Sequence, residues 1–152
     1  MEISYRIASV DDLNAITELS ILMCSGDYCG EHSDDELLIS NREDLLNSKM
    51  AMFLAFDEDK AIGFSHVYMR HEWVIGTENS PVGYLEGIFV CPGYRGQGIA
   101  QTLVIMCEDW SREKGCVEFA SDCDLDNTDS LAFHLKIGFK ETGRIIFGTS
   151  PD

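Results

Sequence analysis

A glycine-rich turn at residues 95–100 has the residue types and the spacing that best fit a chemical task. It reads Arg95-Gly96-Gln97-Gly98-Ile99-Ala100, and Gln101 follows. The first turn of a helix offers backbone N–H groups without partners and a partial positive charge, and glycines let a phosphate approach that backbone closely. Because an apolar strand pattern precedes the turn and an amphipathic helical pattern follows it, the segment predicts a diphosphate site.

Two common nucleotide-binding signatures do not fit this turn. A P-loop needs a lysine that the turn lacks, and a dinucleotide fingerprint needs a third glycine where Gln101 stands. The expected diphosphate therefore belongs to a different class of ligand.

The elements that would position this turn alternate between strand and helix patterns. We expect strands over residues 3–7, 50–56, 61–69, 83–90, 117–121 and 144–149, and helices over 13–23, 37–46, 98–115 and 127–137. Ser9 and Asp12 form a capping-box pattern before the first helix. Gly87 interrupts the strand at 83–90 and predicts a β-bulge, and residues 26–35 read as an irregular acidic loop.

Length and charge limit the function classes. With 152 residues and 45% hydrophobic content, residues 1–152 are expected to form a single α/β (α+β) domain. The net charge of −16 opposes binding to nucleic acid or anionic membranes and attracts cations. No apolar run approaches the roughly 20 residues of a membrane span, and the start of the chain lacks a signal-peptide pattern, so we expect a cytoplasmic protein.

The cysteines and histidines do not indicate a metal site or disulfides. The six cysteines form no C-x-x-C pair, and the four histidines are never spaced to share a helix face with a cysteine. We therefore expect reduced thiols and no metal.

Several segments together resemble one enzyme family. The turn Arg95–Ala100 is similar to the R-x-x-G-x-A pattern of the GCN5-related N-acetyltransferases (GNAT), and HLKIGF at 134–139 resembles their Y-x-x-x-G-F pattern. Ser80–Val90, EFASD at 118–122 and Asn127 extend the likeness to aminoglycoside 6'-N-acetyltransferases. The resemblance implies a mixed central sheet of about six to seven strands, splayed in its centre and flanked by about four helices.

The resemblance also implies a cofactor, acetyl-coenzyme A, as the acetyl donor. The backbone of Ile88, Phe89 and Val90 would pair with its pantetheine arm, and the amides of residues 96–101 would hold its diphosphate. Asn127 would hydrogen-bond the cofactor further along, although it could equally cap the last helix.

Two carboxylates and a tryptophan are expected at the acceptor amine. Glu86 lies in a strand that reads as core, where a carboxylate is costly unless it meets a cation or a hydrogen bond, and this points to the acceptor site. The family carries an acidic residue or a histidine at this position, so the resemblance implies that Glu86 binds the amine and accepts its proton, directly or through water. A strand-edge salt bridge is the alternative. The resemblance implies that Asp122 and Trp73 contact the aminoglycoside. The alternatives are that Asp122 only starts a turn and that Trp73 only anchors the core.

His134 stands where many members of the wider family carry the tyrosine that protonates the leaving thiolate, and imidazole could fill that role or be structural. Cys91 and Cys123 have no histidine at an activating spacing, so we expect direct transfer rather than an acetyl-cysteine. Gly143 and Met23 depart from the residues expected of these enzymes. The alternative functions are a polyamine or protein-amine acetyltransferase and a non-catalytic acetyl-coenzyme A-binding module. The resemblance also suggests a homodimer formed through the C-terminal strands.

Overall fold

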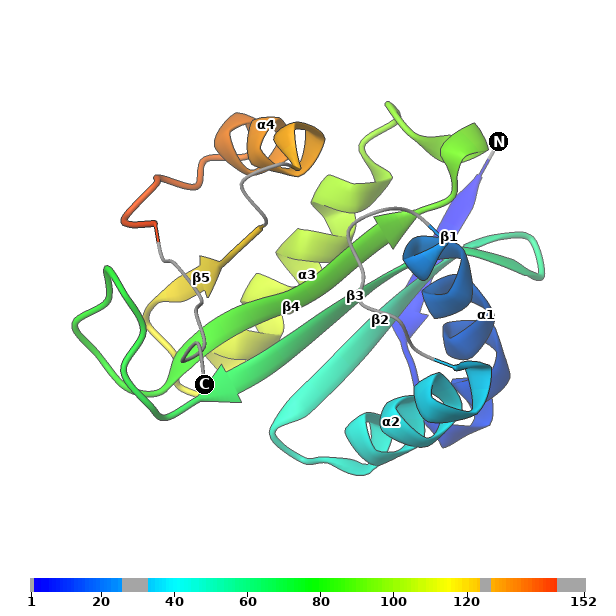
Figure 1. The fold of residues 1–152 in the computed structure, drawn as a ribbon, viewed down its shortest axis with the longest axis horizontal. Coiled ribbons are helices and arrows are strands. Elements are labelled where there is room, and N and C mark those ends of the chain that lie inside the picture. Colours follow the sequence, from blue (N-terminus) through cyan, green and yellow to red (C-terminus); the bar gives the residue numbers. More distant parts are fainter. Residues whose placement is uncertain (1, 26–32, 124–126, 145–152) are drawn as a thin grey trace, which may run out of the picture.

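One five-stranded sheet forms the centre of the protein, in a computed structural model that describes residues 2–25, 33–123 and 127–144. Its strands, in spatial order, are β1 (Ile3–Ile7), β2 (Met50–Asp57), β3 (Lys60–Arg70), β4 (Val82–Val90) and β5 (Phe119–Ser121) (Figure 1). Strands β1 to β4 are antiparallel neighbours, and β5 runs parallel to β4. The described part of the chain thus contains five strands where six to seven were expected. The strand predicted at 144–149 lies outside the described residues, except for Arg144.

Helices cover both faces of this sheet. Helices α1 (Leu13–Cys24) and α2 (Asp34–Leu46) lie on one face, α3 (Ile99–Glu113) crosses the other, and α4 (Thr128–Lys136) lies beside β5 (Figure 1). Short 3-10 turns precede α1 (η1, Val10–Asp12) and α3 (η2, Pro92–Tyr94). The capping box of Ser9 and Asp12 is confirmed, and the Ser9 backbone N–H donates to Asp12 at 2.9 Å.

Strand β2 shows how the alternating pattern builds two apolar layers. Successive side chains of a strand point to opposite faces. Ala51, Phe53 and Ala55 pack in the core that includes α3, whereas Met52 and Leu54 pack with Ile16 and Leu19 of α1. Strand β2 is buried on each face, so it carries apolar side chains on both.

The segment at 26–35, predicted as an irregular acidic loop, ends in the first residues of a helix. Residues 26–32 lie outside the described residues, but Asp34 and Asp35 begin α2 rather than belong to a loop. The Ser33 hydroxyl accepts a hydrogen bond from the Glu36 N–H at 3.1 Å, and acidic side chains favour the first turn of a helix. The charge run therefore stabilises a helix N-terminus.

A bulge in β4 lies where β4 and β5 part. His66 of β3 pairs with Gly87 and Val67 pairs with Leu85, so Glu86 has no partner in this register and is the extra residue. The bulge predicted at Gly87 is therefore centred on its neighbour. Strand β5 pairs with β4 only at Gly83, Tyr84 and Leu85, so the two strands part beyond that point, which confirms the expected splay.

Candidate active site

The glycine-rich turn forms an open cradle at the start of α3. Gly98 is the N-cap of α3, without a side-chain cap, and Gly96 and Gly98 have φ values of 80° and 81°. This left-handed region favours glycine. A Cβ added at either position would meet no atom within 4 Å. Because the first N–H groups of a helix have no partner within it, the cradle fits a diphosphate.

Two side chains fasten this cradle to the sheet. The Arg95 Nε donates to the carbonyl of Val90 at 2.8 Å, and its guanidinium lies 5.6 Å from the ring centroid of Phe89. The Tyr94 hydroxyl donates to Asp57, the last residue of β2, at 2.6 Å. Arg95, predicted to be part of the phosphate site, therefore holds the end of β4 against the turn. The exposed Gln97 and Gln101, the buried Ile99 and the half-buried Ala100 complete the predicted segment.

The predicted pantetheine-binding residues lie along the free edge of β4. Ile88, Phe89 and Val90 pair with Ser65, Phe64 and Gly63 of β3. Their other edge faces the gap, because β5 has already separated from β4. An extended strand edge with unpaired N–H and C=O groups can hydrogen-bond an amide-containing chain. The edge leads to the cradle at residues 96–101, as an elongated donor would require.

Glu86 meets a cation within the protein itself. The Arg70 Nε and Nη2 both donate to Glu86 Oε1, at 3.2 and 2.9 Å, and the Glu86 side chain is 26% exposed. The Arg70 guanidinium also lies 3.6 Å from the ring centroid of Tyr84 and 3.8 Å from a carboxylate oxygen of Glu72. The salt-bridge alternative for Glu86 is therefore realised, and its role toward an acceptor stays a prediction.

Asp122 lies close to the same cluster through Tyr84. The Tyr84 hydroxyl donates a short hydrogen bond to Asp122 Oδ2. Burial, together with the hydrogen bond and the charge of Asp122, raises the pKa of Tyr84, so the phenol stays protonated and remains a donor. Arg70 and Tyr84 were not predicted from the sequence. The i, i+2 spacing of Tyr84 and Glu86, which places them on one face of a strand, was the available signal.

Asp44 of α2 adds a third carboxylate that the sequence analysis missed. Burial and the charges of Glu43 and Glu86 raise its pKa. Asp44 Oδ2 lies 3.9 Å from His66 Nε2, and burial lowers the pKa of His66 to about 4. His66 is therefore neutral at pH 7, so this contact is not an ion pair there. Asp44, Glu86 and Asp122 give this face of the site a negative charge.

His134 is held by two serines on the opposite side of β5 from Asp122. Its Nδ1 lies 2.6 Å from the carbonyl oxygen of Ser130, and its Nε2 lies 2.8 Å from the Ser121 hydroxyl. The ring is 7% exposed. Successive residues of a strand face opposite sides, so Ser121 faces α4 while Asp122 faces Tyr84. The alternative of a buried, hydrogen-bonded histidine is thus observed, and catalysis by His134 stays a prediction.

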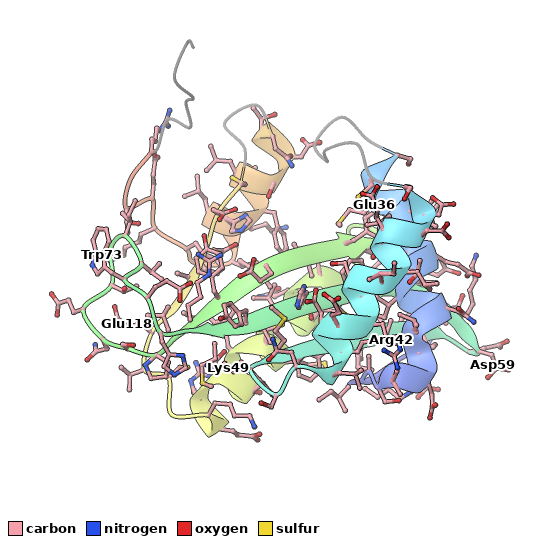
Figure 2. All side chains as sticks on the ribbon, turned by 60° about the horizontal axis from the view of Figure 1, so that its bottom comes forward. Glu36, Arg42, Lys49, Asp59, Trp73 and Glu118 are labelled. Carbon is pink, nitrogen blue, oxygen red and sulfur yellow. The ribbon has the colours of Figure 1, made fainter. Side chains whose placement is uncertain are left out.

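Asn127 and Trp73 lie outside the cluster of carboxylates. The Asn127 side chain accepts a hydrogen bond from the Ser130 N–H at 3.1 Å and so caps α4. Trp73 is 76% exposed, which contradicts the alternative of a core anchor. Figure 2 shows Trp73 pointing outward from the loop between β3 and β4, at the opposite end of the molecule from Asp59.

A cavity of about 730 Å³ lies beside Arg70, Trp73 and Asp122. It lies between the loop that carries Trp73, strand β5 and the segment after α4, and its lining includes Tyr84, Ser121, Asp122 and Gly143. Ser121, which contacts His134, and Asp122, which contacts Tyr84, therefore border one space. Met23, the other departure named from the sequence, packs against the α1 core instead.

The free thiols and possible metal ligands add nothing to the site. Cys91 and Cys123 are half-buried, and Cys107 is buried, with burial raising its pKa to about 12. Among the described residues, no three His, Cys, Asp or Glu side chains are grouped to hold a metal ion. No helix in residues 2–25, 33–123 or 127–144 is long and apolar enough to cross a membrane.

The sequence is similar to one group of enzymes. A family model described as "Acetyltransferase (GNAT) family" matches residues 14–139. Aminoglycoside N(6')-acetyltransferase type 1 of Salmonella typhimurium is 43% identical over 116 residues, which cover 76% of this chain and 80% of the relative. The protein of the same name from Acinetobacter haemolyticus is 44% identical over 104 residues, 68% of this chain and 72% of the relative.

Solved structures agree with these sequence relatives. The structure of AAC(6')-Iy in complex with the bisubstrate analog CoA-S-monomethyl-acetylneamine has a TM-score of 0.90 and 36% identity, and the match covers 100% of both chains. The aminoglycoside 6'-N-acetyltransferase AAC(6')-Ih from Acinetobacter baumannii has a TM-score of 0.87 and 36% identity, over 99% of both chains. The expected fold class, with its splayed central strands, is confirmed by this likeness and by the observed topology.

Proposed function

The chain belongs to the acetyltransferase (GNAT) family, and from this premise we propose that it transfers the acetyl group of acetyl-coenzyme A to the 6'-amine of aminoglycosides. The observation that carries the proposal is the meeting of three features at one gap. These are the open edge of β4, the glycine cradle at the start of α3 and an acidic face that carries Glu86 and Asp122. Such an enzyme would confer resistance to these antibiotics and would act in the cytoplasm.

The donor would enter along the free edge of β4. The edge of β4 at Ile88, Phe89 and Val90 faces the gap, and its backbone groups that neither β3 nor Arg95 engages would pair with the amide-rich arm, while the amides of residues 96–101 would hold the diphosphate. Asn127, as the cap of α4, would contact the donor through the remaining capacity of its amide. The thioester would then lie where β4 and β5 part, near Glu86 on one face and Ser121 on the other.

The acceptor would bind on the acidic face. An aminoglycoside carries several ammonium groups, and the carboxylates of Asp44, Glu86 and Asp122 would attract and orient them. Arg70 already occupies one oxygen of Glu86, so an incoming ammonium must bind the other oxygen or displace Arg70. The exposed indole of Trp73 would cover the sugar rings.

The chemistry would be direct transfer with both substrates bound. Glu86 would accept a proton from the ammonium, directly or through water, and the neutral amine would then attack the thioester carbonyl. A backbone N–H after the bulge would stabilise the oxyanion. His134 would supply a proton to the departing thiolate when its ring is protonated. No acetylated cysteine is needed.

An acceptor panel separates this proposal from its alternatives. Thiol release from acetyl-coenzyme A would be followed with kanamycin, tobramycin, spermidine or a lysine peptide, at two salt concentrations. We expect turnover with the aminoglycosides, weakened by salt and reduced roughly 100-fold in Glu86→Gln. Turnover with spermidine or the peptide alone would favour a polyamine or protein-amine acetyltransferase. Donor binding without turnover on any amine would favour a non-catalytic module.

A homodimer is the second part of the proposal. Val117, just before β5, and Trp73 and Ile75, in the loop between β3 and β4, are 75%, 76% and 39% exposed. Exposed large apolar side chains suit a protein interface. Light scattering on an eluting size-exclusion peak would give twice the chain mass, and the mass of a single chain would refute the dimer.

A further inference from the structure

We propose that Ser121 and His134 form a nucleophile–base pair that hydrolyses acetyl-coenzyme A when no amine is bound. The activity goes beyond amine acetylation, although it rests on the proposed position of the thioester between β4 and β5. The pair uses water as its second substrate and passes through an acetyl ester on the Ser121 hydroxyl.

The hydrogen bonds of His134 assign its neutral tautomer. The Ser130 carbonyl oxygen can only accept a hydrogen bond, so Nδ1 at 2.6 Å must carry the hydrogen. In the neutral ring, Nε2 then has a free lone pair, and the Ser121 hydroxyl at 2.8 Å donates to it. This is the arrangement of a serine nucleophile, a histidine base and a third group that orients the base.

The packing around the ring keeps that orientation. Phe139 and Phe133 meet the imidazole edge-on, with ring centroids 5.2 and 6.0 Å away and interplanar angles of 61° and 81°. The Ser130 hydroxyl lies 3.3 Å from Nδ1, on the same side as the Ser130 carbonyl. The base is thus fixed at the distance at which proton transfer from Ser121 is efficient.

Burial distinguishes the two members of the pair as a nucleophile and its base. His134 is 7% exposed, so its ring is held in place by packing, with Nε2 directed at Ser121. Ser121 is half-buried and borders the 730 Å³ cavity. It is also the last residue of β5 paired with β4, opposite Leu85, and the gap between the strands begins directly after it. The hydroxyl therefore stands at the entrance of the space proposed for the thioester.

The reaction balances without any further reagent. The Ser121 Oγ attacks the thioester carbon, its proton moves to His134 Nε2, the carbon–sulfur bond breaks, and Nε2 returns the proton to the coenzyme A sulfur. Water then attacks the acetyl-Ser121 ester, Nε2 takes one of its protons, and the carbon–Oγ bond breaks as the serine regains that proton. The products are acetate and free coenzyme A.

The test follows thiol release from acetyl-coenzyme A in the absence of any amine. We compare the native chain with Ser121→Ala, His134→Gln and the control Ser48→Ala, which changes an exposed serine in the turn before β2. We expect slow release by the native chain and the control, and a roughly 100-fold lower rate in Ser121→Ala and His134→Gln. Peptide mass spectrometry after a brief incubation should find one added acetyl group on Ser121 of the native chain.

Further readouts keep the outcomes distinct. Coenzyme A binding by calorimetry and the melting temperature establish that each variant is folded and binds the donor. Thiol release that persists in Ser121→Ala, or an acetyl group found only on other residues, would overturn the pair. If the native chain acetylates kanamycin but releases no thiol without it, the hydrolase inference fails while the proposed function stands. If neither reaction occurs although coenzyme A binds, both fail.

Discussion

Replacing Gly98 by alanine tests whether the cradle at the start of α3 holds the donor's diphosphate. Gly98 has a φ of 81°, and an added Cβ would meet no protein atom within 4 Å, so the added methyl group causes backbone strain but no clash. A left-handed conformation costs an L-residue about 1–2 kcal/mol. The methyl group would also occupy the space through which a phosphate oxygen approaches the N–H groups, where a charge-assisted bond contributes about 1.5–3 kcal/mol.

The other end of the same helix supplies a matched control. Gly115 has a φ of 91°, and its added Cβ would also meet nothing within 4 Å. We expect Gly98→Ala and Gly115→Ala to lower the free energy of unfolding by similar amounts, about 1 kcal/mol, in urea titrations. Only Gly98→Ala should weaken coenzyme A binding, by about 10- to 100-fold in calorimetry.

The comparison can refute the cradle directly. If both variants bind coenzyme A with the native Kd, the diphosphate lies elsewhere. If both weaken binding equally, the effect comes from lost stability rather than from the N-terminus of α3.

Two further predictions concern the packing and the acid stability of the fold. A Cβ at Gly83 would lie 2.6 Å from the Ser111 Cβ, so we expect Gly83→Ala to lower the free energy of unfolding by about 1–3 kcal/mol. Gly87→Ala is the tolerant control, because the nearest neighbour of its added Cβ is 3.9 Å away. Equal urea midpoints for the two variants would contradict the close packing of α3 on β4. Burial lowers the pKa of His66 to about 4, so below pH 6.5 the unfolded chain binds more protons than the folded chain. His66 therefore lowers the free energy of unfolding by about 3 kcal/mol as the pH falls from 6.5 to 4. The raised pKa of Asp44 acts in the opposite direction. A His66→Gln variant should therefore lose most of the decrease in unfolding free energy between pH 6.5 and about 4. An unchanged pH profile of unfolding would show that His66 is not buried in its neutral form.

Local sequence signals predicted the strand, turn and helix that form the glycine-rich cradle. The cradle depends on glycines at the first turn of a helix, and both the strand before it and the helix after it have strong apolar periodicity. The start of α2 was misread because its apolar pattern is weak, although Ser33 with Glu36 is a capping signal.

The contacts of Glu86 and Asp122 depend on how the strands pair, which one sequence does not specify. Arg70 reaches Glu86 because β3 and β4 pair antiparallel with a bulge that shifts their register by one residue. Asp122 reaches Tyr84 only because β5 pairs with β4 in parallel. A shift of one residue in either register would send these side chains to the other face.

The pairing of Ser121 with His134 is a similar case. They are thirteen positions apart in the sequence, and α4 must fold back over the end of β5 to bring them to 2.8 Å. His134 was predicted as catalytic by resemblance, but its serine partners became apparent only from the packing of α4.

The position of the acetyl group on the product tests the central claim most directly. The native chain would be incubated with acetyl-coenzyme A and kanamycin, and the product analysed by mass spectrometry and NMR. We expect one added acetyl group on the 6'-nitrogen. Acetylation of a different amine would contradict the proposed acceptor geometry, and unmodified kanamycin in the presence of bound coenzyme A would contradict the proposed function.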